Sequence, residues 1–387
     1  MAYDSNRDVV AGRTATQIGR AKSMAVGGRK KRCVKGKSCS ATCIAANKVC
    51  MVDLPWVAAS QIPKAVSEIK NRGGSVKAPP VPAKSIGQTG KFEGNVLKIE
   101  GQTFTPGKKL PGSTQPTLYV DRDGKGKWVV KEGGAPGQNV AEKAANDVYN
   151  ILAPKLGSGG VDTRMIDGKL VNRFVENGKT LDSLSSADAA KFNIADRIRK
   201  SHIADALVAN WDYLGLVNDN MMVDKGGKLV RIDSGGTFQY RAMGGDKKFG
   251  SLPMETWTLR NGQGKDYWAN AKDSDYRDLW VKQTKDVAAS SSKLGGAINS
   301  SQLPQDVKKA FSQRIAAYAM ANQVITNQKF EGKTISELAN SGAITWKQVD
   351  AAMEKAFKQS SSVDANSKGW GKDVNSEIIK QLGLIVP

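Results

Sequence analysis

Two predicted β-hairpins that enclose one amphipathic helix constrain the fold of this chain more than any other feature. The first hairpin, PTLYVDRDGKGKWVVKEGG (residues 116–134), places two strands rich in β-branched and aromatic residues around the turn DGKG. The second, MIDGKLVNRFVENG (165–178), turns at the dipeptide DG. The helix between them stops at Pro154 and Gly157 and has one apolar face: Val140, Ala144, Val148, Ile151 and Leu152. With a strand in NVLKIEGQTFTP (95–106), this order predicts an α+β lobe over residues 94–184.

Helical patterns dominate after this lobe. Residues 186–211 are strongly helical, with Ser186 as the expected N-cap, and a third hairpin, NMMVDKGGKLVRIDSGG (220–236), turns at KGG. Beyond Gly250 four more helical segments follow, and a tail rich in Ser and Gly occupies residues 361–387. We therefore expect an α+β, two-lobed molecule with a small β-rich lobe and a mostly helical lobe over residues 185–360.

The charge of the chain points to a polyanionic partner. Its 387 residues carry a formal net charge of +21, and residues 9–52 hold ten Lys or Arg without a single Asp or Glu. Such blocks stay extended and serve as interaction tails, so residues 1–52 are expected to be a basic arm for nucleic acid or an acidic protein assembly. A tail that is merely solvated is the alternative. Residues 53–93 are expected to form a short helix and a Pro-rich linker.

The same composition argues against a membrane protein. No run of 18 apolar residues predicts a membrane span, and the N-terminus lacks the pattern of a secretory signal. The expected location is the cytoplasm, or the virion if the chain is phage-encoded.

All four cysteines lie in the arm: Cys33, Cys39, Cys43 and Cys50. Only Cys39 and Cys43 approach the tight spacing with which structural zinc sites begin. The sequence leaves three alternatives for these cysteines: a four-thiolate Zn²⁺ site, two local disulfides or four unpaired thiols.

The third hairpin carries the strongest indication of chemistry. Asn220 and Asp233 stand thirteen residues apart, one on each side of the turn, so the hairpin brings an amide oxygen and a carboxylate together. Magnesium prefers such oxygen ligands and fills its remaining positions with water and phosphate oxygens. The sequence therefore predicts an Mg²⁺ site. An Asp that only caps a turn is the structural alternative.

Phosphoryl transfer also needs a cation on the nucleotide phosphates. Lys131 ends the apolar strand KWVVK, and the next helix offers Glu142 as its ion-pair partner. The loop around Gly112, Ser113 and Thr114 could present backbone N–H groups and hydroxyls to phosphate oxygens. Alternatively, Lys131 and Glu142 are two unpaired surface charges, and the loop has no role in binding phosphate.

The segment NDNMMVDKGGKLVRIDSGG resembles the catalytic core of the atypical kinases grouped around HipA, the type II phosphatidylinositol 4-kinases and the actin-fragmin kinase. The resemblance covers residues 94–290. It implies an ATP site between two lobes, with Lys131 on the phosphates, Glu142 positioning it, and Asn220 with Asp233 binding magnesium. Asp212 would then be the base that accepts the proton of the substrate hydroxyl.

The spacing of the base departs from this family. The family usually places it five residues before the metal-binding Asn, where this chain has Gly215; Asp212 lies eight before, so the segment YLGLV must bulge. Asp219 is the competing base. His202, the only histidine, and the aromatic residues near the site are expected to serve packing.

The leading hypothesis is an ATP- and Mg²⁺-dependent kinase that acts on a hydroxyl. The favoured acceptor is Ser or Thr of a protein, and the alternative acceptor is a lipid or another small molecule. Nucleotidyl transfer on the same scaffold is a second enzymatic hypothesis. The alternative from another class is a non-catalytic kinase-fold adaptor or structural protein, such as a phage-particle protein that binds nucleic acid through its arm.

Overall fold

The computed structural model describes residues 90–110, 115–132, 137–360 and 370–384 of the 387-residue chain, together with the backbone of two short strands at 37–39 and 42–44. The chain divides into two compact units. The first consists of Met1–Lys84 with Val363–Lys372, and the second of Ser85–Ser362 with Asp373–Pro387. In the first unit, β1 (Lys37–Cys39) pairs with β2 (Thr42–Ile44) as an antiparallel hairpin. The second unit holds both predicted lobes.

A seven-stranded antiparallel sheet builds the smaller lobe, in the order β3-β4-β5-β6-β7-β10-β9. Its strands are β3 (Gly90–Glu93), β4 (Val96–Ile99), β5 (Gln102–Lys109), β6 (Thr117–Asp121), β7 (Lys127–Lys131), β9 (Thr163–Ile166) and β10 (Lys169–Arg173). The predicted hairpins are β6–β7 and β9–β10. Asp167 and Gly168 at the second turn both have positive φ, as a tight turn at DG requires. The expected strand at 95–106 is instead two strands, β4 and β5, because Glu100 and Gly101 turn the chain.

Alternate residues of these strands face one core, and the strand period of two explains which side chains are buried. Phe104 and Trp128 meet edge to face there, with ring centroids 6.5 Å apart. The other members of this core are Leu97, Ile99, Tyr119, Val130, Ile166 and Val171. The strand KWVVK thus buries Trp128 and Val130 and delivers Lys131 to its end.

Helix α3 (Gln138–Leu156) follows β7 and connects the two lobes. Of its predicted apolar face, Ala144, Val148 and Leu152 are buried, and Val140 and Ile151 are half-buried. The helix ends at Gly157, whose φ of 69° lets its N–H reach the Ala153 carbonyl. Pro154 was expected to stop the helix but lies inside its last turn. A proline there removes one backbone hydrogen bond, and the helix ends two residues later anyway.

The third hairpin belongs to a second, four-stranded sheet of order β11-β12-β13-β8. Its strands are β8 (Ser158–Gly160), β11 (Lys179–Thr180), β12 (Met221–Val223) and β13 (Leu229–Arg231). β12 and β13 pair with Met221 opposite Arg231, and the turn closes where the Asp224 N–H donates to the Lys228 carbonyl at 2.9 Å. This confirms the predicted hairpin and places Asn220 and Asp233 just beyond its two open ends.

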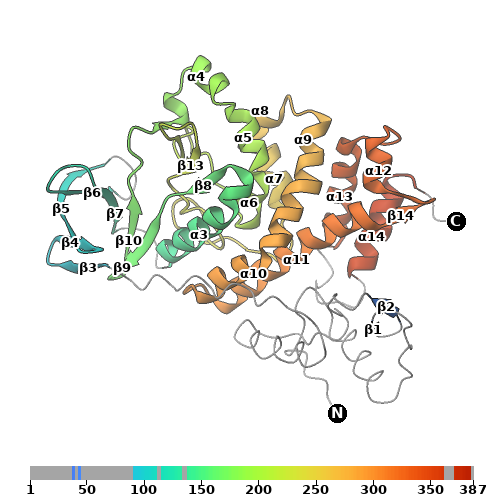
Figure 1. The fold of residues 1–387 in the computed structure, drawn as a ribbon, viewed down its shortest axis with the longest axis horizontal. Coiled ribbons are helices and arrows are strands. Elements are labelled where there is room, and N and C mark those ends of the chain that lie inside the picture. Colours follow the sequence, from blue (N-terminus) through green and yellow to red (C-terminus); the bar gives the residue numbers. More distant parts are fainter. Residues whose placement is uncertain are drawn as a thin grey trace, which may run out of the picture. The chain divides into compact units, whose positions relative to one another are not determined.

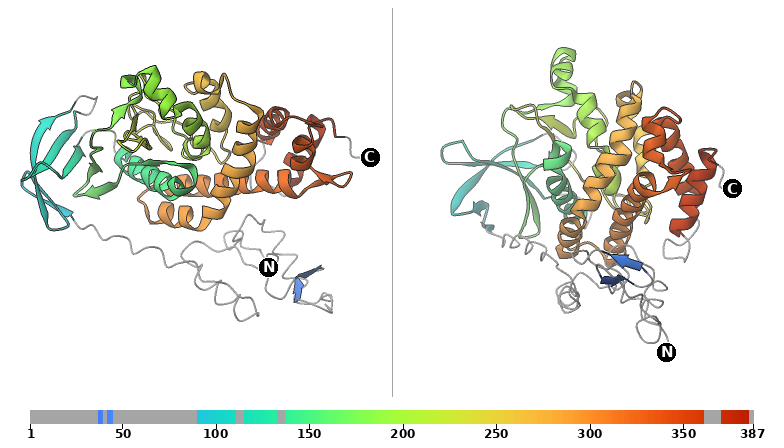
Figure 2. Two further views of the ribbon diagram at one scale, coloured as in Figure 1. Left: turned by 45° about the horizontal axis from the view of Figure 1, so that its top comes forward. Right: turned by 45° about the vertical axis from the view of Figure 1, so that its right-hand side comes forward.

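Helices make up most of the larger lobe (Figures 1 and 2). They are η3 (Leu181–Ser183), α4 (Ser186–Lys191), α5 (Ile194–Lys200), α6 (His202–Leu207), α7 (Glu255–Asn261), α8 (Lys265–Trp268), α9 (Asp273–Arg277), the π-helical turn η4 (Asp278–Gln283), α10 (Thr284–Ser300), α11 (Gln305–Asn327), α12 (Ile335–Asn340) and α13 (Trp346–Ser360). A small hairpin, β14 (Lys329–Phe330) with β15 (Lys333–Thr334), separates α11 from α12.

Two details of this lobe differ from the sequence prediction. The N-cap of α4 is Ser185, whose hydroxyl accepts the Asp188 N–H at 3.0 Å, and Ser186 is the first helical residue. The helical segment 186–211 is broken into α4, α5 and α6. Asn193, with a left-handed φ of 54°, separates α4 from α5, and Ser201, with a non-helical φ of −114°, separates α5 from α6. In addition, helix α14 (Trp370–Gln381) lies within the segment expected only to be a tail.

The described residues thus form the α+β, two-lobed architecture that the sequence predicts. Figure 1 shows the β-rich lobe at one end, α3 beside it, and the helices α7 to α13 beyond. Among the described residues, no helix combines the length and the apolar character needed to cross a membrane.

Candidate active site

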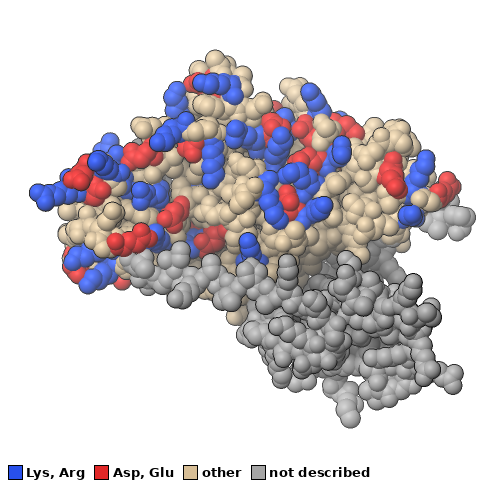
Figure 3. Space-filling view, viewed as in Figure 1, with Lys and Arg blue, Asp and Glu red and all other residues tan. Residues whose placement is uncertain are grey.

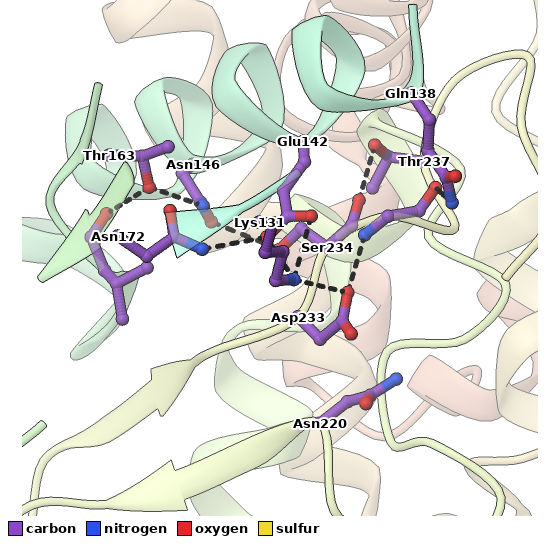
Figure 4. Close-up of polar contacts among 12 residues, drawn as sticks. Lys131, Gln138, Glu142, Asn146, Thr163, Asn172, Asn220, Asp233, Ser234 and Thr237 are labelled. Atoms are coloured by element: carbon purple, nitrogen blue, oxygen red, sulfur yellow. Dashed lines mark hydrogen bonds and ion pairs between the residues drawn. The ribbon is translucent and has the colours of Figure 1, made fainter. Parts of the chain in front are cut away.

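Lys131 lies buried at the end of β7 and is paired with two carboxylates (Figure 4). Its Nζ is 2.8 Å from Glu142 Oε1 and 3.2 Å from Asp233 Oδ1. Burial alone would lower the pKa of Lys131, but the two carboxylates outweigh it and hold this pKa above its usual value. The structure therefore brings the predicted Lys131–Glu142 pair together and joins Asp233 to it.

One stripe of α3 faces the site, with Gln138, Glu142 and Asn146 four residues apart and hence on one side of the helix. Glu142 Oε1 also accepts a hydrogen bond from Asn172 Nδ2 at 3.1 Å. At the next turn, Asn146 Oδ1 accepts from Ser234 Oγ at 3.1 Å. Gln138 Nε2 lies 3.2 Å from the carbonyls of both Gly235 and Ala242. These contacts tie α3 directly to the segment that follows Asp233.

The hairpin β12–β13 aligns Asn220 with Asp233. The Ile232 N–H donates to the Asn220 carbonyl at 3.0 Å, which continues the ladder beyond the strands. Asp233 Oδ1 accepts the Gly235 N–H at 3.1 Å, and its side chain is 51% exposed. Neither Asp233 Oδ2 nor Asn220 Oδ1 accepts a hydrogen bond from any described residue. Figure 4 shows the Asp233 carboxylate between Lys131 and Asn220.

These two oxygens fit a magnesium ion. A carboxylate and an amide oxygen are ligands of the kind that Mg²⁺ takes, and the exposure of Asp233 leaves room for waters and phosphate oxygens. Within the described residues there is no group of three or more His, Cys, Asp or Glu side chains that would form a protein-only cage. Two protein ligands suit an ion that arrives with a nucleotide.

Asp212 reaches Asn220 through the bulge that the sequence requires. The Gly215 N–H donates to the Asp212 carbonyl at 3.1 Å, and the Asn220 N–H donates to the Leu214 carbonyl at 3.1 Å. Gly215 has a φ of +80°, and a Cβ there would lie 2.1 Å from Asp219 Oδ1 and 3.2 Å from the Asn220 nitrogen, so any other residue would be strained and crowded. Asn220 Nδ2 then donates to Asp212 Oδ2 at 3.0 Å.

The environment of Asp212 differs from that of Asp219. Half-burial raises the pKa of the Asp212 carboxyl above its usual value, although hydrogen bonds from Gln263 and Asn220 oppose this. Asp219 is exposed. Of the two competing carboxylates, Asp212 is the one whose side chain contacts the candidate metal ligand.

A buried polar network beneath the site was not anticipated from the sequence. Asp205 of α6 accepts hydrogen bonds from Arg231 Nε at 2.7 Å and from Tyr149 Oη at 3.0 Å. Asn210 Nδ2 donates to Tyr149 Oη at 3.0 Å, and Asn210 Oδ1 accepts the Asp212 N–H at 3.3 Å. The network thus links α3, the Asp212 loop and strand β13, which leads to Asp233. The one available signal was an arginine inside the apolar run LVRI.

Lys247 is a second unanticipated residue. Its Nζ donates to the Ala209 carbonyl at 2.5 Å and to the Gly236 carbonyl at 2.6 Å. It is only 8% exposed, and burial lowers the pKa of Lys247 to about 7. Ala209 has a left-handed φ of 52°, so Lys247 holds a strained turn against the loop after Asp233.

The remaining predicted site residues are not placed. Gly112, Ser113 and Thr114 lie outside the described residues, although the Leu110 N–H donates to the Pro116 carbonyl at 2.7 Å and closes the β5–β6 connection that contains them. Cys33 and Cys50 lie outside as well, and Cys39 and Cys43 belong to strands described only by their backbone. The Zn²⁺ site stays a prediction.

Of the other residues that the sequence analysis expects to serve packing, some are buried and one is exposed. His202, Tyr213 and Phe238 are buried in the core of the larger lobe, as expected. Trp211 was also expected to pack, but 41% of its surface is exposed.

No protein-family model matches the sequence, and no curated protein matches it. Among solved structures, the chain is similar to the proinflammatory kinase CtkA of Helicobacter pylori, with 13% identity and a TM-score of 0.34; the match covers 57% of this chain and 94% of that chain. It is also similar to the choline kinase LicA of Streptococcus pneumoniae, with 15% identity and a TM-score of 0.23, over 71% of this chain and 92% of that chain. Because both likenesses are distant, the account of the site rests on the contacts described above.

Proposed function

We propose that the chain is an ATP- and Mg²⁺-dependent phosphotransferase that acts on a hydroxyl group. The observation that carries this proposal is the set of contacts that gathers four side chains at one place. Lys131 from the smaller lobe pairs with Asp233, and the neighbouring Ile232 N–H donates to the Asn220 carbonyl. The Asn220 amide in turn donates to Asp212. An ammonium, two candidate metal ligands and a carboxylate base are the groups that phosphoryl transfer requires. The resemblance of this segment to the HipA and phosphatidylinositol 4-kinase group supports the same assignment.

Each residue has a role in this proposal. Asp233 and Asn220 would hold Mg²⁺, which would supply positive charge that neutralises the phosphates. Lys131, kept charged by its two carboxylates, contacts the phosphates, and Glu142 fixes its position. The hydroxyl oxygen of the acceptor attacks the terminal phosphorus, the bond to the leaving ADP oxygen breaks, and Asp212 accepts the hydroxyl proton. The raised pKa of Asp212 makes its carboxylate a stronger proton acceptor than an ordinary aspartate.

The basic N-terminal arm suggests a binding partner for the proposed enzyme. The first 89 residues hold 16 Lys and Arg against four Asp and Glu. By contrast, the described face in Figure 3 carries basic and acidic side chains interspersed, without one large basic patch. A nucleic acid or an acidic assembly would therefore bind the arm rather than this face, and we infer that the arm delivers the enzyme to its target.

Transfer of label from ATP tests the proposal. The purified chain is incubated with Mg²⁺ and ATP labelled at either the γ- or the α-phosphate, together with a generic protein acceptor. Label from the γ-position alone is expected. Transfer should be abolished in Asp233→Asn and fall by about 10²–10⁴-fold in Asp212→Asn. The exposed neighbour Asp219→Asn serves as the control and should stay near wild type.

The outcomes separate the hypotheses. Label transferred from the α-position would replace phosphotransfer by nucleotidyl transfer. Binding of ATP without any transfer would make the chain an adaptor with a kinase fold.

A further inference from the structure

The large apolar side chains that are exposed, among the residues whose side chains the structure describes, belong to the two loops that approach Asp212. They are Trp211, Leu216, Val217 and Met243, exposed by 41%, 96%, 60% and 81%. The other large hydrophobic side chains within residues 90–110, 115–132, 137–359 and 376–384 are buried or half-buried. Single exposed apolar residues are common on protein surfaces, but a group confined to one site marks a place of interaction.

Leu216 and Val217 are exposed because of the bulge that carries Asp212 to the site. The bulge is pinned at its base, where the Asn220 N–H donates to the Leu214 carbonyl, so the residues between project outward. Gly215, Asn218 and Asp219 shape this loop through positive φ or close contact. Leu216 and Val217 have no such part in it, so the loop does not require apolar side chains at these two positions.

Met243 belongs to a second loop that adjoins the same carboxylate. A Cβ at Gly236 would lie 2.9 Å from Asp212 Cβ and 3.5 Å from the Ala242 nitrogen, so residue 242 is held close to Asp212. From the same loop, the Arg241 guanidinium lies 5.5 Å from the centre of the Trp211 ring. The two loops therefore flank the base from which the acceptor hydroxyl is to be activated.

The chemistry of this surface selects its occupant. The occupant must bring a hydroxyl to Asp212 and apolar groups to its surroundings, which a small hydrophilic alcohol cannot do. The exposed charges of the two loops are mixed: they include Arg241 and Lys248 as well as Asp219 and Asp246. An anionic bilayer offers opposite charges to the two cations only, whereas a polypeptide can match both signs.

Resting on the proposed function, we propose that Trp211, Leu216, Val217 and Met243 form the docking surface for a protein acceptor. The acceptor presents Ser or Thr to Asp212 and sets aliphatic or aromatic side chains on this surface. Since an extended chain advances about 3.3 Å per residue, these side chains lie within a few positions of the hydroxyl.

Peptide binding tests this proposal independently of catalysis. Fluorescently labelled Ser/Thr peptides with Leu, Met or Phe near the hydroxyl are compared with peptides that have Ser or Gln there, by fluorescence anisotropy on the full chain. The apolar peptides should bind more tightly. Burying two aliphatic side chains predicts that Leu216→Ser/Val217→Ser weakens their binding by about 10–100-fold. Both residues are exposed, so the variant should fold.

Matched variants and a vesicle arm complete the test. Leu216→Met/Val217→Ile should retain the preference, and Lys225→Ser, exposed in the β12–β13 turn, should change nothing. All these variants should bind Mg·ATP with the same Kd as wild type. If the wild-type chain itself does not bind Mg·ATP, the proposed function is refuted, not the docking surface. Equal affinity for apolar and polar peptides, or a preference that survives Leu216→Ser/Val217→Ser, would overturn the docking surface. The docking surface would also be overturned if the chain sediments with phosphatidylcholine vesicles containing phosphatidylserine in a manner that depends on Leu216, and shows no preference among the peptides.

Discussion

The substitution Glu142→Ala tests whether the buried ion pair holds the site together. It removes the carboxylate that pairs with Lys131 at 2.8 Å and that accepts from Asn172 at 3.1 Å, both in the interior. Breaking a buried pair on one side costs about 3–5 kcal/mol, because the other charge is left uncompensated. Asp233 stays 3.2 Å from Lys131, so we expect the lower end of this range.

Urea unfolding followed by tryptophan fluorescence measures the cost, because Trp128 is buried in the same lobe. The neighbouring Glu132→Ala is the matched control. Glu132 pairs with Lys169 at 2.6 Å, but both side chains are partly or largely exposed, so the loss should stay within about 1 kcal/mol.

A double variant separates stability from function. Lys131→Met/Glu142→Leu replaces the pair by apolar side chains of similar volume and should recover most of the stability. It should nevertheless fail to bind Mg·ATP, because the ammonium is gone. The reasoning is refuted if Glu142→Ala unfolds at the same urea concentration as Glu132→Ala, or if the double variant binds Mg·ATP like wild type.

Three further predictions concern the bulge, the buried histidine and the arm. Gly215→Ala should cost about 1–3 kcal/mol and reduce phosphotransfer, whereas Gly226→Ala, at a position without positive φ or a close backbone contact, should do neither; unfolding and transfer assays compare the two. Burial lowers the pKa of His202 to about 4, so the unfolded chain takes up a proton below pH 6.5 while the folded chain does not. Wild type should therefore lose about 2 kcal/mol more than His202→Gln between pH 6.5 and 4.5 in urea unfolding, and equal losses would contradict the assignment. Deleting residues 9–52 removes ten basic side chains and should abolish salt-sensitive retention on DNA; retention that persists unchanged would assign binding elsewhere.

Local patterns were enough to predict the elements that carry the site. The turn signals DGKG, DG and KGG fix three hairpins, and the apolar spacing in residues 138–157 fixes α3. The proximity of Asn220 and Asp233 follows from hairpin geometry alone, because a tight turn forces the flanking residues together. The Lys131–Glu142 contact is also local, since β7 and α3 are consecutive.

Features that depend on tertiary burial could not be predicted in this way. Arg231 and Asp205 are 26 residues apart, and nothing local shows that both are buried and paired. Lys247 resembles its exposed neighbour Lys248 in sequence, yet the fold encloses only Lys247. The break at Asn193 depends on one left-handed residue that a helical pattern tolerates. The bulge at Gly215 was inferred only from a spacing that departs from related kinases.

The central claim is that one cation binds between Asn220 and Asp233, opposite the Lys131 ammonium. A crystal structure with Mn²⁺ and a non-hydrolysable ATP analogue tests it most directly, because Mn²⁺ substitutes for Mg²⁺ and gives an anomalous signal. We predict an anomalous peak within about 2.3 Å of Asp233 and of the Asn220 amide oxygen, with Lys131 on the phosphates. A nucleotide bound elsewhere, or a metal that ignores both side chains, would contradict the account.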